Sequence, residues 1–210
     1  MHQPRLTLLI VAICGMLACG CGSKNNTTTS LYDIDSLIRD QIRHFIDQKI
    51  EIKKKAVLNG IEKETIVEPK DSADWEEELA IFSELDIINR PINRTLYKVE
   101  EIKDKESNLH IKSFTTTDEL PVKYLKVYYF KTIDRIRKIE AQYNAQNSLY
   151  KSARMLTLEF EEIGGRAVLT SYAVDGGQKM FLDDSVQYTI DAGIVRKQIK
   201  GWQKGMEEKD

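Results

Sequence analysis

The three cysteines carry the most distinctive side-chain chemistry in this chain, and they lie together near its start, at Cys14, Cys19 and Cys21. A thiol can form a disulfide, ligate a metal ion or act as a nucleophile. Residues 22–210 contain no cysteine. The rest of the protein therefore has no disulfide scaffold, no cysteine-ligated zinc site and no cysteine nucleophile.

The segment around the cysteines has the form of a signal peptide. Residues 1–5 are weakly basic, residues 6–17 are apolar or small, and residues 18–21 supply small side chains for cleavage. The apolar run is shorter than the roughly 20 residues that a membrane-spanning helix needs. We expect residues 1–20 to be a signal peptide and the polar residues 21–30 to be a flexible tether.

The same segment resembles the lipobox of bacterial lipoproteins, in which small or aliphatic residues precede a cysteine that is lipidated and becomes the mature N-terminus. Met16-Leu17-Ala18-Cys19 and Ala18-Cys19-Gly20-Cys21 both fit, so Cys19 and Cys21 are alternative lipidation sites. The resemblance implies an acyl anchor in a lipid bilayer, and glycine rather than aspartate after either cysteine implies the outer membrane. Plain secretion, with the cysteines incidental, is the alternative.

Catalytic motifs are not found elsewhere in the sequence. Beyond the signal, the two histidines, His44 and His110, have no partner at metal-ligand spacing, and no Gly-x-Ser-x-Gly motif nominates a nucleophile. The acidic pairs Glu161-Glu162 and Asp183-Asp184 lie at predicted turns, where acids are common. We expect no enzymatic activity, no cofactor and no metal site, and keep an envelope hydrolase as an alternative.

Tyrosines supply a weak candidate for a binding groove. Tyr124, Tyr128 and Phe130 alternate onto one face of a predicted strand, and Tyr129 lies on the other. Such a row can pack in a core or line a groove for an apolar or sugar ligand.

A second weak candidate is a modification site. Asp71-Ser72-Ala73 resembles the Asp-Ser/Thr-aliphatic acceptor of bacterial protein O-glycosylation, and it falls in a predicted loop. Asp35-Ser36-Leu37 and Asp184-Ser185-Val186 have the same form without a clear loop. Ser72 is therefore the candidate glycosylation site.

Composition limits the possible partners. The chain has 210 residues, 31 Lys and Arg against 33 Asp and Glu, and a net charge of -2. A nearly balanced chain has no positive field with which to gather nucleic acid, so we expect no nucleic-acid partner. Attachment to a membrane must then come from lipid rather than from a basic surface.

Two amphipathic helices are predicted to position these residues. Apolar side chains recur at helical spacing over residues 31–50, behind a capping box formed by Ser30 and Asp33. A second capping box, Asp74–Glu77, begins a helix that should end near Asn89, because Arg90-Pro91 follows.

The remaining pattern is β. Asn59-Gly60 predicts a hairpin near residues 53–67. From residue 96 onward, apolar alternation and turn residues predict successive strands, with corners at Gly164-Gly165 and Gly176-Gly177. The predicted strands cover residues 96–103, 109–116, 122–131, 139–143, 149–160, 167–174, 179–182 and 186–190.

These elements predict an α+β domain over residues 31–202, followed by a charged tail at 203–210. Two N-terminal helices should pack on a curved antiparallel meander, and a closed or half-open β-barrel is the alternative. The element order resembles small envelope lipoproteins of Gram-negative bacteria and, loosely, their lipoprotein carriers and receptors. That resemblance implies a curved sheet whose concave face can hold acyl chains.

The sequence therefore favours a lipid-anchored envelope protein with a non-catalytic binding or scaffolding domain.

 The two alternatives are a carrier or sensor that holds a hydrophobic ligand in the sheet concavity, and an envelope hydrolase. The expected partners of the protein are the lipid bilayer, through the acyl anchor, and an envelope protein or a hydrophobic ligand.

Overall fold

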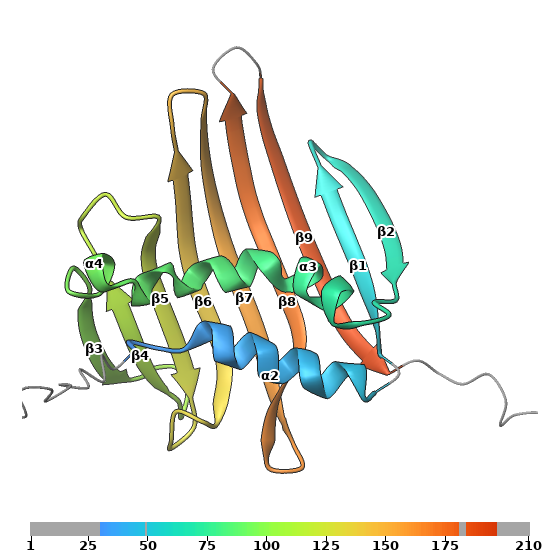
Figure 1. The fold of residues 1–210 in the computed structure, drawn as a ribbon, viewed down its shortest axis with the longest axis horizontal. Coiled ribbons are helices and arrows are strands. Elements are labelled where there is room, and N and C mark those ends of the chain that lie inside the picture. The colour runs from blue at the N-terminus through green and yellow to red at the C-terminus, as the bar shows by residue number, and fades with distance from the viewer. Residues whose placement is uncertain (1–29, 49, 181–183, 197–210) are drawn as a thin grey trace, which may run out of the picture.

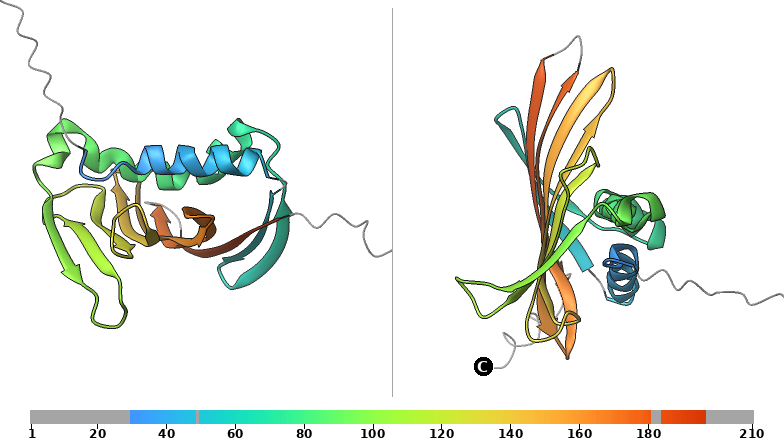
Figure 2. Two further views of the ribbon diagram at one scale, coloured as in Figure 1. Left: turned by 90° about the horizontal axis from the view of Figure 1, so that it is seen from below. Right: turned by 90° about the vertical axis from the view of Figure 1, so that its left-hand side faces the viewer.

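The computed structural model describes residues 30–48, 50–180 and 184–196, and within them an antiparallel sheet carries helices on one face (Figures 1 and 2). The helices are α2 (Ile34–Ile46), α3 (Ser72–Ser83), the 3₁₀ helix η2 (Glu84–Asn89) and α4 (Pro91–Arg94). The strands are β1 (Ile50–Leu58), β2 (Ile61–Val67), β3 (Lys98–Lys103), β4 (His110–Thr115), β5 (Val122–Tyr129), β6 (Ile136–Gln146), β7 (Tyr150–Ile163), β8 (Arg166–Met180) and β9 (Ser185–Arg196).

Several predicted features lie outside the described residues. They are the signal peptide, both candidate lipidation sites Cys19 and Cys21, the tether up to residue 29, and the chain from residue 197, including the charged tail.

The sheet is open. Its strand order is β2-β1-β9-β8-β7-β6-β5-β4-β3, so β3 to β9 form the predicted meander and the β1–β2 hairpin joins its last strand. Strands β2 and β3 are the two edges and do not pair with each other, so the predicted alternative of a closed barrel is wrong. Helix α2 precedes β1, and α3 follows the β1–β2 hairpin and precedes β3.

The β1–β2 turn forms as its sequence predicts. Asn59 and Gly60 have φ values of 47° and 83°, which a two-residue hairpin turn requires. The backbone N–H of Asn59 donates to the carbonyl oxygen of Gln187, and the Gln187 N–H donates to Asn59 Oδ1, both at 2.9 Å. These bonds fasten the turn to β9.

Helix α2 is shorter than the predicted range of 31–50. Asp33, rather than Ser30, caps it by accepting a hydrogen bond from the Ser36 N–H at 2.9 Å. The backbone before α2 is bound to the side chain of Asn89. The Leu31 N–H donates to Asn89 Oδ1, and Asn89 Nδ2 donates to the Tyr32 carbonyl oxygen.

Helix α3 begins earlier than predicted. Asp71 accepts from the Asp74 N–H at 3.0 Å, and Asp74 accepts from the Lys70 N–H at 2.8 Å, so the capping pair is Asp71 and Asp74. The helix tightens into η2 after Ser83 and ends at Asn89, the predicted boundary. Pro91 then begins α4, a position where its missing N–H costs no hydrogen bond.

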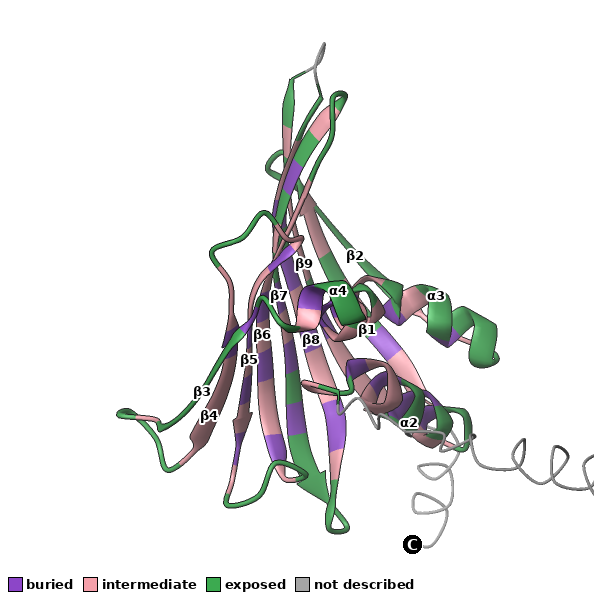
Figure 3. Ribbon diagram, turned by 60° about the vertical axis from the view of Figure 1, so that its left-hand side comes forward, coloured by how far each residue is buried: buried purple, intermediate pink, exposed green. Residues whose placement is uncertain are grey.

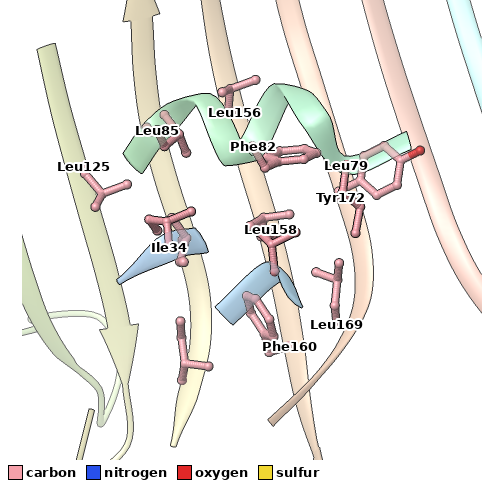
Figure 4. Packing of buried hydrophobic residues seen from close by; sticks show 14 of the residues in the cluster. Ile34, Leu79, Phe82, Leu85, Leu125, Leu156, Leu158, Phe160, Leu169 and Tyr172 are labelled. Carbon is pink, nitrogen blue, oxygen red and sulfur yellow. The ribbon is translucent and has the colours of Figure 1, made fainter. Parts of the chain in front are cut away.

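Apolar side chains fill the space between the helices and the sheet. The Phe45 and Trp75 rings, 4.7 Å apart, join α2 to α3, and Phe82 meets the Tyr172 ring of β8 edge-on at 5.4 Å. Figure 4 shows part of this layer, including Phe82, Leu125 and Tyr172. These three side chains, and those of Phe45 and Trp75, are at most 4% exposed. Burial of one such side chain contributes about 1.5–3 kcal/mol. The helices therefore occupy the apolar face of the sheet.

The Gly176-Gly177 pair does not form the predicted corner. Both glycines lie inside β8, which continues to Met180. A Cβ atom on Gly176 would lie 2.8 Å from the Tyr188 hydroxyl oxygen, and one on Gly177 would lie 2.6 Å from Gln187 Nε2. The glycines thus make room for side chains from the neighbouring strand, whereas Gly164 and Gly165, both with positive φ, form the predicted β7–β8 turn.

Candidate functional site

The face of the sheet opposite the helices, called the open face here, is covered by no described element (Figure 2). Alternate residues of each strand point to it. Along β5 these residues are Tyr124, Lys126 and Tyr128, whereas Leu125 and Val127 are buried beneath the helices. Figure 3 shows this alternation of buried and less buried residues along the strands.

The register places polar and small residues in rows across the open face. One row runs from Asn144 through Ala153 and Gly177 to Gln187, on β6, β7, β8 and β9. The neighbouring row runs from Tyr124 through Gln142 and Met155 to Asp175, on β5 to β8. Amide side chains therefore flank a floor of two small residues.

Apart from Tyr124, the residues of these two rows line a hollow of about 500 Å³, called the upper hollow here. It lies on the ends of β6–β9 that extend past α3 in Figure 1. Its lining residues therefore belong to strands rather than to a loop.

A second hollow, of about 430 Å³, lies farther along the open face and is called the lower hollow here. Its floor includes Ser171, Ala173 and Gly193, and Lys53, Glu159 and Asp191 border it. Charged residues of both signs line both hollows, and the upper one also has side-chain amides, among them Gln142, Asn144 and Gln187.

The structure places two of the predicted aromatic residues on the open face, although neither lines one of these two hollows. The Tyr124 hydroxyl donates to Met155 Sδ at 3.6 Å, and the Tyr128 hydroxyl donates to Glu140 Oε2 at 2.7 Å. Lys126 Nζ lies 5.2 Å from the centre of the Tyr124 ring, and Lys138 Nζ lies 4.9 Å from that of Tyr128. Both tyrosines are thus held on the open face by charged neighbours.

Partial burial and neighbouring groups shift the pKa values of Tyr124, Tyr128 and Glu140. Burial, and then the carboxylate of Glu140, raises the pKa of Tyr124. Burial, and then the hydrogen bond to Glu140, also raises the pKa of Tyr128. Burial acts to raise the pKa of Glu140, but hydrogen bonds from Lys138 and Tyr128 leave it below its ordinary value. The tyrosines therefore stay protonated and able to donate hydrogen bonds at neutral pH.

Phe130, the third predicted groove residue, lies beyond the end of β5. The charged groups of Arg135 and Lys131 lie 4.9 and 5.2 Å from the centre of its ring. The pairing of β5 with β6 is irregular between Tyr128 and Tyr129, so simple alternation does not extend to Phe130. Tyr129 is buried.

Ser72, the glycosylation candidate, is not in a loop as predicted. It is the first residue of α3, exposed, and its hydroxyl donates to Glu76 Oε1 at 2.9 Å. Its modification stays a prediction.

The two histidines occupy separate places. His110 of β4 stacks on Tyr129 with ring centres 5.6 Å apart. His44 lines a groove of about 720 Å³ between α2 and the turns that join β5 to β6 and β7 to β8. Among the described residues no group of three or more His, Cys, Asp or Glu side chains is placed to hold a metal ion. In the same part of the chain, no helix has the length and apolarity needed to cross a membrane.

Sequence reasoning identified Tyr124 and Tyr128 but missed the hollows and their amides. The signal that could have found them was the glycine pair in β8, which we interpreted as a turn. Comparison with known proteins adds no assignment: no family model, curated protein or solved structure matches the chain.

Proposed function

We propose that this protein is a lipid-anchored envelope protein whose open sheet face is a non-catalytic binding surface. The observation that carries the binding surface is the difference between the two faces of the sheet. The helices fill one face with packed apolar side chains, while the other bears Tyr124, Tyr128 and two hollows. A rigid sheet that presents polar groups around hollows is suited to recognition.

The anchor rests on the lipobox resemblance at Cys19 and Cys21. A polar tether of about ten residues would then restrict the domain to a layer near the membrane, which raises its effective concentration for a partner there. The proposed localisation is the bacterial cell envelope, with the outer membrane favoured.

The two other functions considered from the sequence have less support. A carrier of acyl chains requires space beneath the helices, where side chains such as Leu79 and Phe82 are fully buried. A hydrolase requires converging catalytic groups, and His44 and His110 lie on separate elements among other neighbours. No observation in the described residues favours either function.

Metabolic labelling with an alkyne fatty acid tests the anchor. The full-length protein should incorporate the label and enter the membrane fraction. Replacement of the true acceptor, Cys19 or Cys21, by alanine should abolish both. Label that persists in the Cys19→Ala/Cys21→Ala double variant would contradict the lipid anchor.

A further inference from the structure

Strand β3 forms one edge of the sheet and, among the described strands, pairs only with β4 (Figure 1). All six of its residues are exposed, so no described residue covers this edge. We propose that β3 is the interface through which two copies of this chain pair antiparallel and extend one continuous sheet. This inference goes beyond the proposed function and does not depend on the lipid anchor.

The pairing of β3 with β4 shows which backbone groups of β3 face outward. The Asp104 N–H donates to the Leu109 carbonyl oxygen at 2.9 Å, so the backbone groups of Asp104 point toward β4. This direction alternates from residue to residue along an antiparallel strand. The N–H and C=O groups of Val99, Glu101 and Lys103 therefore point away from β4, where no described strand pairs with them. They can bind the backbone of a second strand.

A two-fold axis through Val99, perpendicular to the sheet, makes the edges of two copies complementary. Val99 then faces Val99 of the other copy, and the two residues exchange a pair of backbone hydrogen bonds. Lys98 of each copy faces Glu100 of the other, and such opposite-charge pairs stabilise a sheet. The Val99 side chain is 44% exposed, so its contact with the second copy also buries apolar surface.

An ion pair within each copy adds to this complementarity. Lys98 Nζ lies 2.8 Å from Glu100 Oε1 of its own chain. Both residues are on the open face, because their cross-strand partners on β4 in turn pair with Tyr124 and Lys126 of β5. In the dimer the two ion pairs therefore lie side by side, and charge alternates in sign around the four side chains. A network of this kind is more stabilising than one exposed pair.

Other alignments of two β3 strands bring like charges together, which destabilises a sheet. An axis through a charged residue places that residue against its own copy, which excludes Lys98, Glu100, Glu101 and Lys103. An axis through Ile102 places Glu100 against Asp104. Parallel pairing about a two-fold axis places every residue of β3 beside its own copy. Among the residues of β3, the axis through Val99 alone avoids like-charge pairs.

Cysteine cross-linking tests the alignment, since residues 22–210 contain no cysteine. Val99→Cys and Ile102→Cys, at two exposed apolar positions of β3, are made in a full-length chain that keeps only the anchor cysteine. Under mild oxidation Val99→Cys should form a disulfide-linked dimer, because its Cα atoms would lie about 5.5 Å apart, within disulfide reach. Ile102→Cys should react far more slowly, because its copy would lie six residues along the strand, about 20 Å away. The parent chain without an added cysteine should not cross-link.

Sedimentation velocity of the full-length protein, in a detergent matched to the solvent density, measures the association. We expect a wild-type dimer with a dissociation constant of about 10–100 µM, because the interface is small. Lys98→Glu should raise this constant about tenfold, since two cross-strand pairs become like-charged. Lys98→Glu/Glu100→Lys should restore the wild-type value, because the exchanged charges are again opposite within each copy and between copies.

Lys63→Glu is the matched control, because it makes the same charge reversal at an exposed position of the other edge strand, β2. It should dimerise like the wild type. A wild type that stays monomeric at about 1 mM overturns the proposal. So does a Lys98→Glu/Glu100→Lys variant as weak as Lys98→Glu, or equal weakening by Lys63→Glu. Cross-linking of Ile102→Cys as fast as that of Val99→Cys also contradicts the pairing about Val99.

Discussion

At the scale of single residues, a polar cluster fixes α3 against the sheet. Glu78 of α3 lies 2.6 Å from Lys54 Nζ and accepts a hydrogen bond from the Tyr172 hydroxyl. The Glu78 and Lys54 side chains are only 12% and 21% exposed. Strand alternation turns Lys54 toward the helices, whereas its neighbours Lys53 and Lys55 are exposed.

Removal of the Glu78 carboxylate should destabilise the fold. Glu78→Ala leaves an ammonium group and a tyrosine hydroxyl unpaired in a mostly buried place, which costs about 2–3 kcal/mol. Glu77→Ala, at an exposed position of the same helix, should change stability by less than about 0.5 kcal/mol. Urea denaturation of both variants measures the difference. Equal unfolding midpoints would show that the cluster contributes nothing.

Tyr97 gives the fold a defined loss of stability in alkali. It is 7% exposed, its hydroxyl donates to the Val122 carbonyl oxygen at 2.7 Å, and burial raises its pKa to about 12. The folded state therefore keeps a proton that the unfolded state, with a pKa of about 10, releases. Its stabilising contribution is complete below pH 10 and is lost as the pH rises toward 12.

A comparison of wild type with Tyr97→Phe isolates this effect from the titration of other groups. The free energy of unfolding should fall more steeply for the wild type between pH 9 and 11, because phenylalanine has no proton to release. Urea midpoints at the two pH values give the slopes. Parallel slopes for the two proteins would contradict the assigned origin.

At the scale of elements, the sequence predicts local structure better than long-range pairing. Asn59-Gly60 and Gly164-Gly165 form the predicted turns, since their conformation depends on the residues themselves. The pairing of β1 with β9, in which Ile52 faces Ile194, joins segments far apart in the sequence. No local pattern specifies that contact. The hollows escaped prediction for the same reason, because their rows depend on the register of four strands.

The two glycines of β8 should respond differently to alanine. At Gly176 the new Cβ would meet the Tyr188 hydroxyl and, at 3.0 Å, the Ala153 carbonyl oxygen, which cannot move freely. At Gly177 it would meet the flexible end of Gln187. Gly176→Ala should cost about 1–3 kcal/mol, and Gly177→Ala much less. Thermal and urea unfolding distinguish them, and a reversed order would contradict this packing.

The exposed edge strand β2 carries acids that oppose self-association. If two copies paired antiparallel about Glu64, this carboxylate would face its own copy, and Glu62 would face Ile66. Glu62→Thr/Glu64→Thr should therefore associate more strongly than the wild type in sedimentation velocity. Glu76→Gln/Glu77→Gln on α3 removes the same charge away from the edge and should not. Unchanged mass for the edge variant would count against this role.

At the scale of the whole molecule, the two faces of the sheet have different roles. The helices cover one face and provide the core, which leaves the other free to present the hollows (Figure 2). In the proposed function the anchor supplies location and the open face supplies recognition. The α+β class and the meander were predictable from periodicity. Which face stays uncovered was not, because it depends on where the helices pack.

The absence of cysteine from residues 22–210 allows a direct test of the open face. Single cysteines at Met155 on the open face and at Arg39 on α2, in a chain that keeps only the anchor cysteine, can be labelled with a maleimide. The measurement compares labelling rates in intact cell envelopes with those of the purified protein. We predict several-fold slower labelling at position 155 in envelopes and no change at position 39. Unchanged labelling at 155, or protection at 39 instead, would contradict the assignment of the open face as the binding surface.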